Sequence, residues 1–154
     1  MITQRLLTRL QQLGLTVSTA ESCTGGNIAH RLTLVPGASE AYSGSVVSYT
    51  NQVKSSLLGV PEETLRLYGA VSQNTVTAMA AGVCRAIGTD CAMATSGIAG
   101  PGGGTPSKPV GTVWIAVRTP YREESRCFHF SGTRSEIINQ ATEAAISLLL
   151  GILP

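Results

Sequence analysis

Charge is scarce in this sequence. Charged residues make up 13% of the 154 residues, and the formal net charge is only +2. The arginines are scattered along the chain, and no basic run is interleaved with aromatic residues, so the pattern typical of nucleic-acid binding is missing. No apolar run approaches the roughly 20 residues that a membrane-spanning helix needs. We therefore expect a cytoplasmic protein that binds neither nucleic acid nor a membrane.

Patterns for metal binding and for disulfide bonds are also missing. The four cysteines form no C-x-x-C pair and no zinc-ligand spacing, and neither of the two histidines has a carboxylate at ligand spacing. The single aspartate, Asp90, begins a predicted buried strand far from the hydroxyl-rich segments, and no G-x-S-x-G turn occurs. Both facts argue against a Ser-His-Asp triad. We expect a reduced protein with no metal site and no cofactor.

What the sequence does have is apolar residues, at 43%, in the periodic patterns of secondary structure. Residues 2–13 show helical spacing that ends at Gly14, and Ser72 suits the N-cap of a helix over 73–87. The predicted strands are 15–20, 43–50, 90–97, 110–119 and 123–132. Helices alternate with the first strands, and a hairpin follows. We expect one domain over residues 1–154, with a three-layer α/β/α fold and a mixed, mostly parallel sheet of about five strands.

Two glycine-rich segments follow predicted strands: ESCTGG (21–26) and SGIAGPGGG (96–104). The first precedes a helix, whose N-terminal N–H groups could hold an anion, and the second offers unhindered backbone to a ligand. Neither segment is a Walker A motif, because G-K-[ST] is missing, and neither is G-x-G-x-x-G. Taken alone, each segment is equally compatible with a connection that binds nothing.

A third segment, PGASEAYSGSVVSYTNQVK (36–54), is rich in hydroxyl groups and contains one of the two lysines in the chain. Lys54 falls in the first turn of a predicted helix, where the helix dipole disfavours an ammonium group, and burial would lower its pKa further. A neutral lysine can take the proton of a serine nucleophile, for which Ser39 is the candidate, with Tyr49 assisting the transfer. A solvated surface lysine and a serine that caps a helix would explain the same spacing.

These residues also allow interpretations other than a serine nucleophile with Lys54 as its base. The Ser-Tyr-Lys set of short-chain dehydrogenases needs Y-x-x-x-K, whereas YTNQVK is Y-x-x-x-x-K, and no dinucleotide fingerprint precedes it. We therefore reject it. Cys23 is a second candidate nucleophile, because it lies at a predicted strand-to-helix turn that could lower its pKa. A domain that binds a nucleotide or a partner protein without catalysis is the remaining alternative.

Read together, these segments resemble the family of the C-terminal domain of the competence/damage-inducible protein CinA, whose members include nicotinamide-nucleotide amidohydrolases. The resemblance runs through the strings TVSTAESCTGG, YTNQVKSSLLGV, GAVSQ, TSGIAGPGGG and FSGTR, in that order. It implies a metal-independent serine amidohydrolase that converts the carboxamide of nicotinamide mononucleotide to the acid and releases ammonia. It also implies that Ser39, Tyr49 and Lys54 are the catalytic residues.

The resemblance further implies a substrate pocket built from the two glycine-rich loops. Its expected binding residues are Thr19, Glu21, Ser22, Thr24, Gly25, Gly97, Ala99, Gly100 and Arg134. Arg134 would hold the phosphate, because a guanidinium fork matches phosphate oxygens. The expected partner is thus a pyridine nucleotide. The apolar faces of the terminal helices in addition favour a homodimer.

Overall fold

The computed structural model describes residues 1–154, which form five strands, six α-helices and one short 3₁₀ turn. The strands are β1 (Val17–Glu21), β2 (Tyr42–Val47), β3 (Cys91–Gly97), β4 (Thr112–Arg118) and β5 (Glu123–His129). The helices are α1 (Ile2–Leu13), α2 (Asn27–Thr33), α3 (Asn51–Leu58), α4 (Glu62–Tyr68), α5 (Gln73–Ile87) and α6 (Arg134–Ile152). The 3₁₀ turn, η1, spans Ala38–Glu40 and directly precedes β2.

The strands form one sheet in the order β2-β1-β3-β4-β5. β1 pairs in parallel with both β2 and β3, whereas β4 runs antiparallel to β3 and to β5. The predicted mixed sheet of five strands is confirmed, with parallel and antiparallel pairings in equal number. Because β1, β2 and β3 are parallel, their carboxyl ends meet at one edge of the sheet, which is where α/β proteins build ligand sites.

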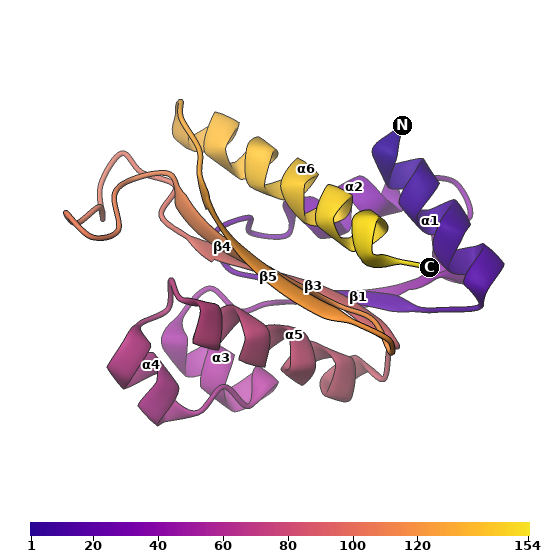
Figure 1. Ribbon diagram of the computed structural model, residues 1–154, viewed down its shortest axis with the longest axis horizontal. Helices are drawn as coiled ribbons and strands as arrows, with labels where there is room; N and C mark the ends of the chain where they lie inside the picture. Colours follow the sequence, from indigo (N-terminus) through magenta and orange to yellow (C-terminus); the bar gives the residue numbers. More distant parts are fainter.

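Helices cover both faces of the sheet, as expected for a three-layer fold (Figure 1). α1, α2 and α6 lie on one face, and α3, α4 and α5 lie on the other. Side chains of β3 alternate between the two faces. Cys91 and Met93 join the larger apolar cluster, which contains residues of α1 and α6, whereas Ala92 and Ala94 join a smaller cluster with α5. A strand covered on both sides therefore lacks the apolar–polar alternation of a sheet with one wet face.

The apolar faces of the two terminal helices are buried within the chain. Leu6, Leu7 and Leu10 of α1 belong to the same core cluster as Ile146 and Leu149 of α6, and none of them is more than 1% exposed. The faces on which the expected homodimer rested are therefore occupied, so a dimer would need another surface. None of the helices is both long enough and apolar enough to cross a membrane.

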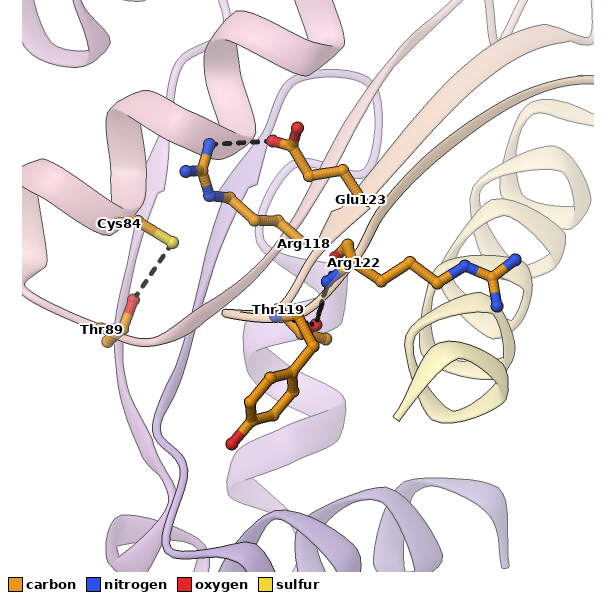
Figure 2. A network of polar contacts seen from close by, with 7 residues as sticks. Cys84, Thr89, Arg118, Thr119, Arg122 and Glu123 are labelled. Carbon is orange, nitrogen blue, oxygen red and sulfur yellow. Dashed lines mark hydrogen bonds and ion pairs between the residues drawn. The ribbon is translucent and has the colours of Figure 1, made fainter. Parts of the chain in front are cut away.

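The β4–β5 hairpin is closed by a threonine at its turn (Figure 2). The Thr119 hydroxyl accepts hydrogen bonds from the backbone N–H groups of Tyr121 (3.1 Å) and Arg122 (2.9 Å). Beside the turn, Arg118 and Glu123 form an ion pair of 2.9 Å between the two strands, as Figure 2 shows. A hydroxyl that holds two turn amides explains how the chain reverses here without a glycine.

Local capping signals place the helix ends close to where the sequence predicts them. Gly14 ends α1 with a φ of 67°, and the hydroxyl of Ser72 accepts a hydrogen bond from the Thr75 N–H at the start of α5. α3 begins after Thr50, whose hydroxyl accepts from the Val53 N–H. That cap sets Lys54 at the fourth position of α3, the helix that follows β2 after the short link 48–50.

Candidate active site

A pocket of about 290 Å³ opens at the carboxyl ends of β1 and β3, beside the first turn of α3. The predicted site residues that line it are Ser22, Tyr49, Lys54, Gly97, Ala99, Gly100 and Arg134. A larger hollow of about 670 Å³ lies between β5 and α6, but neither a lysine nor a histidine lines it. The smaller pocket is therefore the one in which a serine hydroxyl lies beside a lysine amine.

That pocket contains a buried amine next to a serine hydroxyl. Lys54 is only 1% exposed, and its Nζ lies 3.0 Å from Ser22 Oγ. The same Nζ donates to the backbone carbonyl oxygens of Ser48 (3.0 Å) and Tyr49 (3.3 Å). All ion pairs of the chain are formed by arginines, so no carboxylate neutralises Lys54.

These surroundings favour the neutral form of the amine. Burial lowers the pKa of Lys54 below its ordinary value of 10.5, because desolvation penalises the ammonium, and only a charge on Cys23 would oppose this. The carbonyl oxygens of Ser48 and Tyr49 can only accept, so they hold two N–H groups. The third contact of Nζ is with Ser22 Oγ, which accepts from it at 3.0 Å, while the Ser22 hydroxyl is 3.5 Å from the Tyr49 carbonyl oxygen. When the amine is neutral, its lone pair can take the position that faces Ser22 and receive the hydroxyl proton.

Ser22 is held in place because it continues the edge of the sheet. It follows β1 directly, and its N–H donates to the Thr95 carbonyl oxygen of β3 at 3.0 Å. Consecutive side chains of an extended chain point to opposite faces, so Glu21 faces α2 while Ser22 faces α3. The N–H groups of Cys23 and Thr24 donate no hydrogen bond to any other residue. Backbone donors that could hold an oxyanion therefore lie next to Ser22 in the chain.

The structure does not bring Ser39 to Lys54. Ser39 lies in η1, next to the start of the sheet, where the Val17 N–H donates to the Ala41 carbonyl oxygen at 2.8 Å. Lys54 contacts the chain after β2 ends, and β2 spans six residues, so roughly 20 Å separates the two residues. The predicted Ser39–Lys54 pair is corrected accordingly. Ser22, which the sequence suggested only as a binding residue, lies beside the amine instead.

Tyr49 contacts Lys54 only through its main chain. Its carbonyl oxygen accepts from Nζ, but its hydroxyl accepts from Arg134 Nη2 at 2.9 Å, and the residue is 56% exposed. Arg134 Nη1 also donates to the Gly100 carbonyl oxygen at 2.7 Å. The guanidinium thus joins the β2–α3 loop to the glycine loop at the rim of the pocket. The proton transfer predicted for the Tyr49 hydroxyl does not fit this orientation.

Glu21 is a fully buried carboxylate that caps α2. Its two oxygens accept hydrogen bonds of 2.7–3.1 Å from the N–H groups of Gly26, Ile28 and Ala29 and the hydroxyls of Thr19 and Thr24. The carboxylate therefore occupies the helix N-terminus where the sequence suggested a bound anion. Thr19, Glu21, Thr24 and Gly25 do not line the pocket, so the binding roles predicted for them do not fit their positions.

Cys23 lines the pocket but is poorly suited to be the nucleophile. Burial raises the pKa of its thiol to about 12, with only partial relief from a hydrogen bond to Thr95. The reactive form of a cysteine is the thiolate, which such a pKa suppresses at neutral pH.

Two polar pocket residues were not singled out from the sequence: Asn51, in the first turn of α3, and Ser96, the penultimate residue of β3. Ser96 belongs to the glycine-rich segment SGIAGPGGG, in which the sequence pattern indicates only an accessible backbone. The signal that could have identified it is its place at the carboxyl end of a buried strand beside Ser22.

Comparisons with known proteins all point to one family, and the matches extend along almost the whole chain. The family profile described as the CinA C-terminal domain matches residues 1–153. A CinA-like protein of Endomicrobium trichonymphae is 52% identical over 134 residues, which cover 87% of this chain and 31% of that protein. A CinA-like protein of Desulfotalea psychrophila is 44% identical over 140 residues, covering 91% of this chain and 34% of that protein. The chain thus spans about a third of the length of these relatives.

Solved structures match the fold over almost the full length. A CinA superfamily protein from Klebsiella pneumoniae has a TM-score of 0.95 and 36% identity, with 99% of this chain and 95% of that chain covered. A competence/damage-inducible protein from Agrobacterium tumefaciens has a TM-score of 0.95 and 40% identity, with coverage of 97% and 92%. The profile match, the sequence identities and the shared fold show that this chain belongs to the CinA C-terminal domain family.

Proposed function

We propose that this domain is an amidohydrolase that releases ammonia from the carboxamide of nicotinamide mononucleotide, with Ser22 as nucleophile and Lys54 as base. The observation that carries the proposal is the 3.0 Å contact between Ser22 Oγ and the buried Nζ of Lys54. A serine hydroxyl needs a base to become nucleophilic, and a lysine whose pKa is lowered by burial can serve. The pyridine nucleotide is the substrate that the family resemblance implies.

The first half of the reaction forms an acyl-enzyme. Ser22 Oγ attacks the carboxamide carbon, and its proton moves to Lys54 Nζ. The resulting oxyanion is held by the N–H group of Cys23, which lines the pocket and donates to no other residue. The C–N bond then breaks, the nitrogen receives the proton that Lys54 had taken, and ammonia leaves an ester on Ser22.

The second half restores the enzyme by the same route in reverse. A water molecule attacks the ester carbon and gives a proton to Lys54. The bond between carbon and Ser22 Oγ breaks, and Lys54 returns the proton to that oxygen. The carboxylic acid leaves as its carboxylate. The single neutral amine thus takes and returns one proton in each half, which requires a group that titrates reversibly in the pocket.

The rim of the pocket supports an anionic substrate. Arg134 donates to the Tyr49 hydroxyl and the Gly100 carbonyl oxygen, and it is the one arginine that lines the pocket. A guanidinium presents paired N–H donors that match phosphate oxygens. We assign the phosphate of the nucleotide to Arg134 and the carboxamide to the interior, where Ser22 and Lys54 lie.

The experiment that tests the proposal is ammonia release from nicotinamide mononucleotide, the dinucleotide and free nicotinamide. Ser22→Ala and Lys54→Met should each lower kcat by about 1,000-fold or more, because the two residues act as one unit. Ser39→Ala is the matched serine control and should stay within about threefold of the wild type, because it lies outside the site. An acyl group on Ser22 should appear by mass spectrometry of enzyme quenched during turnover.

Two outcomes would overturn the assignment. Loss of activity in Ser39→Ala with retention in Ser22→Ala would return the nucleophile to η1. Binding of the nucleotide in calorimetry, with no ammonia released from any of the amides, would instead make the domain a nucleotide-binding module without catalysis.

A further inference from the structure

Ser96 carries a hydroxyl in the pocket that the mechanism above does not use. The residue is 1% exposed and lines the same pocket as Ser22 and Lys54. Its hydroxyl makes no hydrogen bond within the chain, whereas nearly every other buried hydroxyl does. Ser48 Oγ is the one buried side-chain polar atom that is both sealed from solvent and without a partner. The Ser96 hydroxyl is therefore unpartnered but still accessible from the pocket.

The register of the sheet places Ser96 beside the nucleophile. Glu21 of β1 pairs with Thr95 of β3, and both of these side chains hydrogen-bond to Thr24, on the α2 face of the sheet. The next residue of each strand points the opposite way, so Ser22 and Ser96 both face the side of α3. Adjacent strands lie about 4.8 Å apart. Two hydroxyls at that spacing can both reach one carboxamide group.

A hydroxyl suits the nitrogen of the substrate better than its oxygen. The oxygen needs donors only, and the Cys23 N–H, which lines the pocket and donates to no other residue, is one. The nitrogen changes character during the reaction: it donates through N–H in the planar amide, and it gains a lone pair when the carbon becomes tetrahedral. A serine hydroxyl can accept a hydrogen bond in the first state and donate one in the second, which a backbone N–H cannot.

We propose that Ser96 is a catalytic residue that binds the carboxamide nitrogen and relays the proton from Lys54 to the leaving ammonia. This inference rests on the proposed amidohydrolase function. As the C–N bond breaks, Ser96 gives its hydroxyl proton to the nitrogen. Lys54 then turns the N–H that faced Ser22 toward Ser96 and passes it the proton taken from Ser22. The relay leaves Ser96 unchanged, Lys54 neutral and Ser22 acylated, so protons and electrons balance.

The test compares leaving groups that do and do not need a proton. Wild type, Ser96→Ala and Ser96→Cys are assayed with the nucleotide carboxamide and with its methyl thioester, whose thiolate leaves without protonation. Ser96→Ala should lose about 100-fold or more in kcat with the carboxamide, as removal of a general acid does, and less than about threefold with the thioester. Ser96→Cys, a weak donor of nearly the same size, should move in the same direction. Ser43→Ala, an exposed serine in β2, is the control substitution.

Each outcome has a distinct meaning. Equal losses with carboxamide and thioester would show that Ser96 acts on the oxyanion or on the fold, and would overturn the proposal, as would no loss with either. Retained thioester hydrolysis shows at the same time that the variant is folded. If the wild type hydrolyses neither substrate, it is the proposed function that fails, and this result is separate from any behaviour of the Ser96 variants.

Discussion

Ser22 and Lys54 are 32 residues apart in the chain, and their side-chain polar atoms lie 3.0 Å apart in the fold. Ser22 follows the carboxyl end of β1, and Lys54 lies in the first turn of the helix that follows β2. The parallel pairing of the two strands brings their carboxyl ends to the same edge of the sheet. A hydroxyl and a buried amine therefore meet without any contribution from a histidine or a carboxylate.

The first prediction concerns the pH dependence of activity. Burial lowers the pKa of Lys54 below 10.5, so the fraction of active, neutral amine rises as pH increases. The profile of kcat/KM should show an ascending limb whose midpoint lies below 10.5. Lys54→Arg should be inactive at every pH, because a guanidinium does not lose its proton in this range. A rate that falls with rising pH would contradict the assignment of Lys54 as base.

The same pKa shift should affect stability. Between the lowered pKa of the folded state and 10.5, the unfolded chain binds more protons at Lys54 than the folded chain does. The free energy of unfolding should therefore rise with pH through that window, and the destabilisation is complete below the folded pKa. In urea unfolding, the free energy of unfolding of Lys54→Met should not show this rise with pH. Lys108→Met, at the other lysine of the chain, should keep it.

Glu21 should matter for stability more than any exposed acid. Its carboxylate accepts five hydrogen bonds at the start of α2, three of them from backbone N–H groups. Glu21→Gln turns one acceptor oxygen into a donor that faces another donor, and should cost about 2–4 kcal/mol, since a hydrogen bond to a charged group contributes 1.5–3. Glu40→Gln, an exposed acid in η1, is the matched control. Equal denaturant midpoints for the two variants would show that Glu21 is not the cap of α2.

Local signals predicted much of this fold, because strands and helix ends depend on nearby residues. The apolar run of β3, the glycine that ends α1 and the N-cap at Ser72 are all such signals. Lys54 also stood out locally, as a cation at the wrong end of a helix. Its partner, Ser22, did not stand out, because the residue that lies beside Lys54 is determined by the register of the β1–β2 pairing. Ser39 precedes β2 and meets the start of β1, whereas the residue after β1 meets the residues after β2.

The direction of individual side chains was the second feature that the sequence did not predict. Tyr49 follows β2 as expected, yet its hydroxyl contacts Arg134, which comes from a helix 85 residues later. Glu21 stands in the segment expected to bind substrate, but alternation along β1 turns it toward α2 and Ser22 toward the pocket. A shift of one residue in such a segment exchanges a structural position for one in the pocket.

Cys23 should prove inert. Its thiol pKa of about 12 leaves little thiolate at neutral pH, and its side chain is buried. Iodoacetamide at pH 7.5 should therefore not inhibit ammonia release by the folded protein, and Cys23→Ala should retain this activity. Mass spectrometry after alkylation identifies which cysteines react. Inhibition that tracks modification of Cys23, and that is lost in Cys23→Ala, would favour the alternative nucleophile.

Arg134 should determine recognition of the anionic group rather than the chemistry. Arg134→Ala removes the guanidinium from the pocket rim but leaves Ser22 and Lys54 in contact. It should raise KM for nicotinamide mononucleotide by about tenfold or more, the loss expected for a charged hydrogen bond, and leave KM for the riboside, which lacks the phosphate, unchanged. Tyr49→Phe removes only the hydroxyl that Arg134 holds, and separates the loss of that contact from the loss of charge. A similar rise in KM for both substrates would argue against phosphate recognition by Arg134.

Gly82 should control the position of Lys54 from the neighbouring helix. A Cβ at Gly82 in α5 would lie 1.9 Å from the Leu58 carbonyl oxygen at the end of α3, so the two helices touch through bare backbone. Gly82→Ala must push α3 away, which should cost about 1–3 kcal/mol of stability, and lower kcat because α3 carries Lys54. Gly151→Ala in α6 meets no atom within 4 Å and should be neutral or up to about 1 kcal/mol stabilising. Urea unfolding and ammonia release measure the two effects separately, and a Gly82→Ala variant that matches Gly151→Ala in both would refute the close approach of α3 and α5.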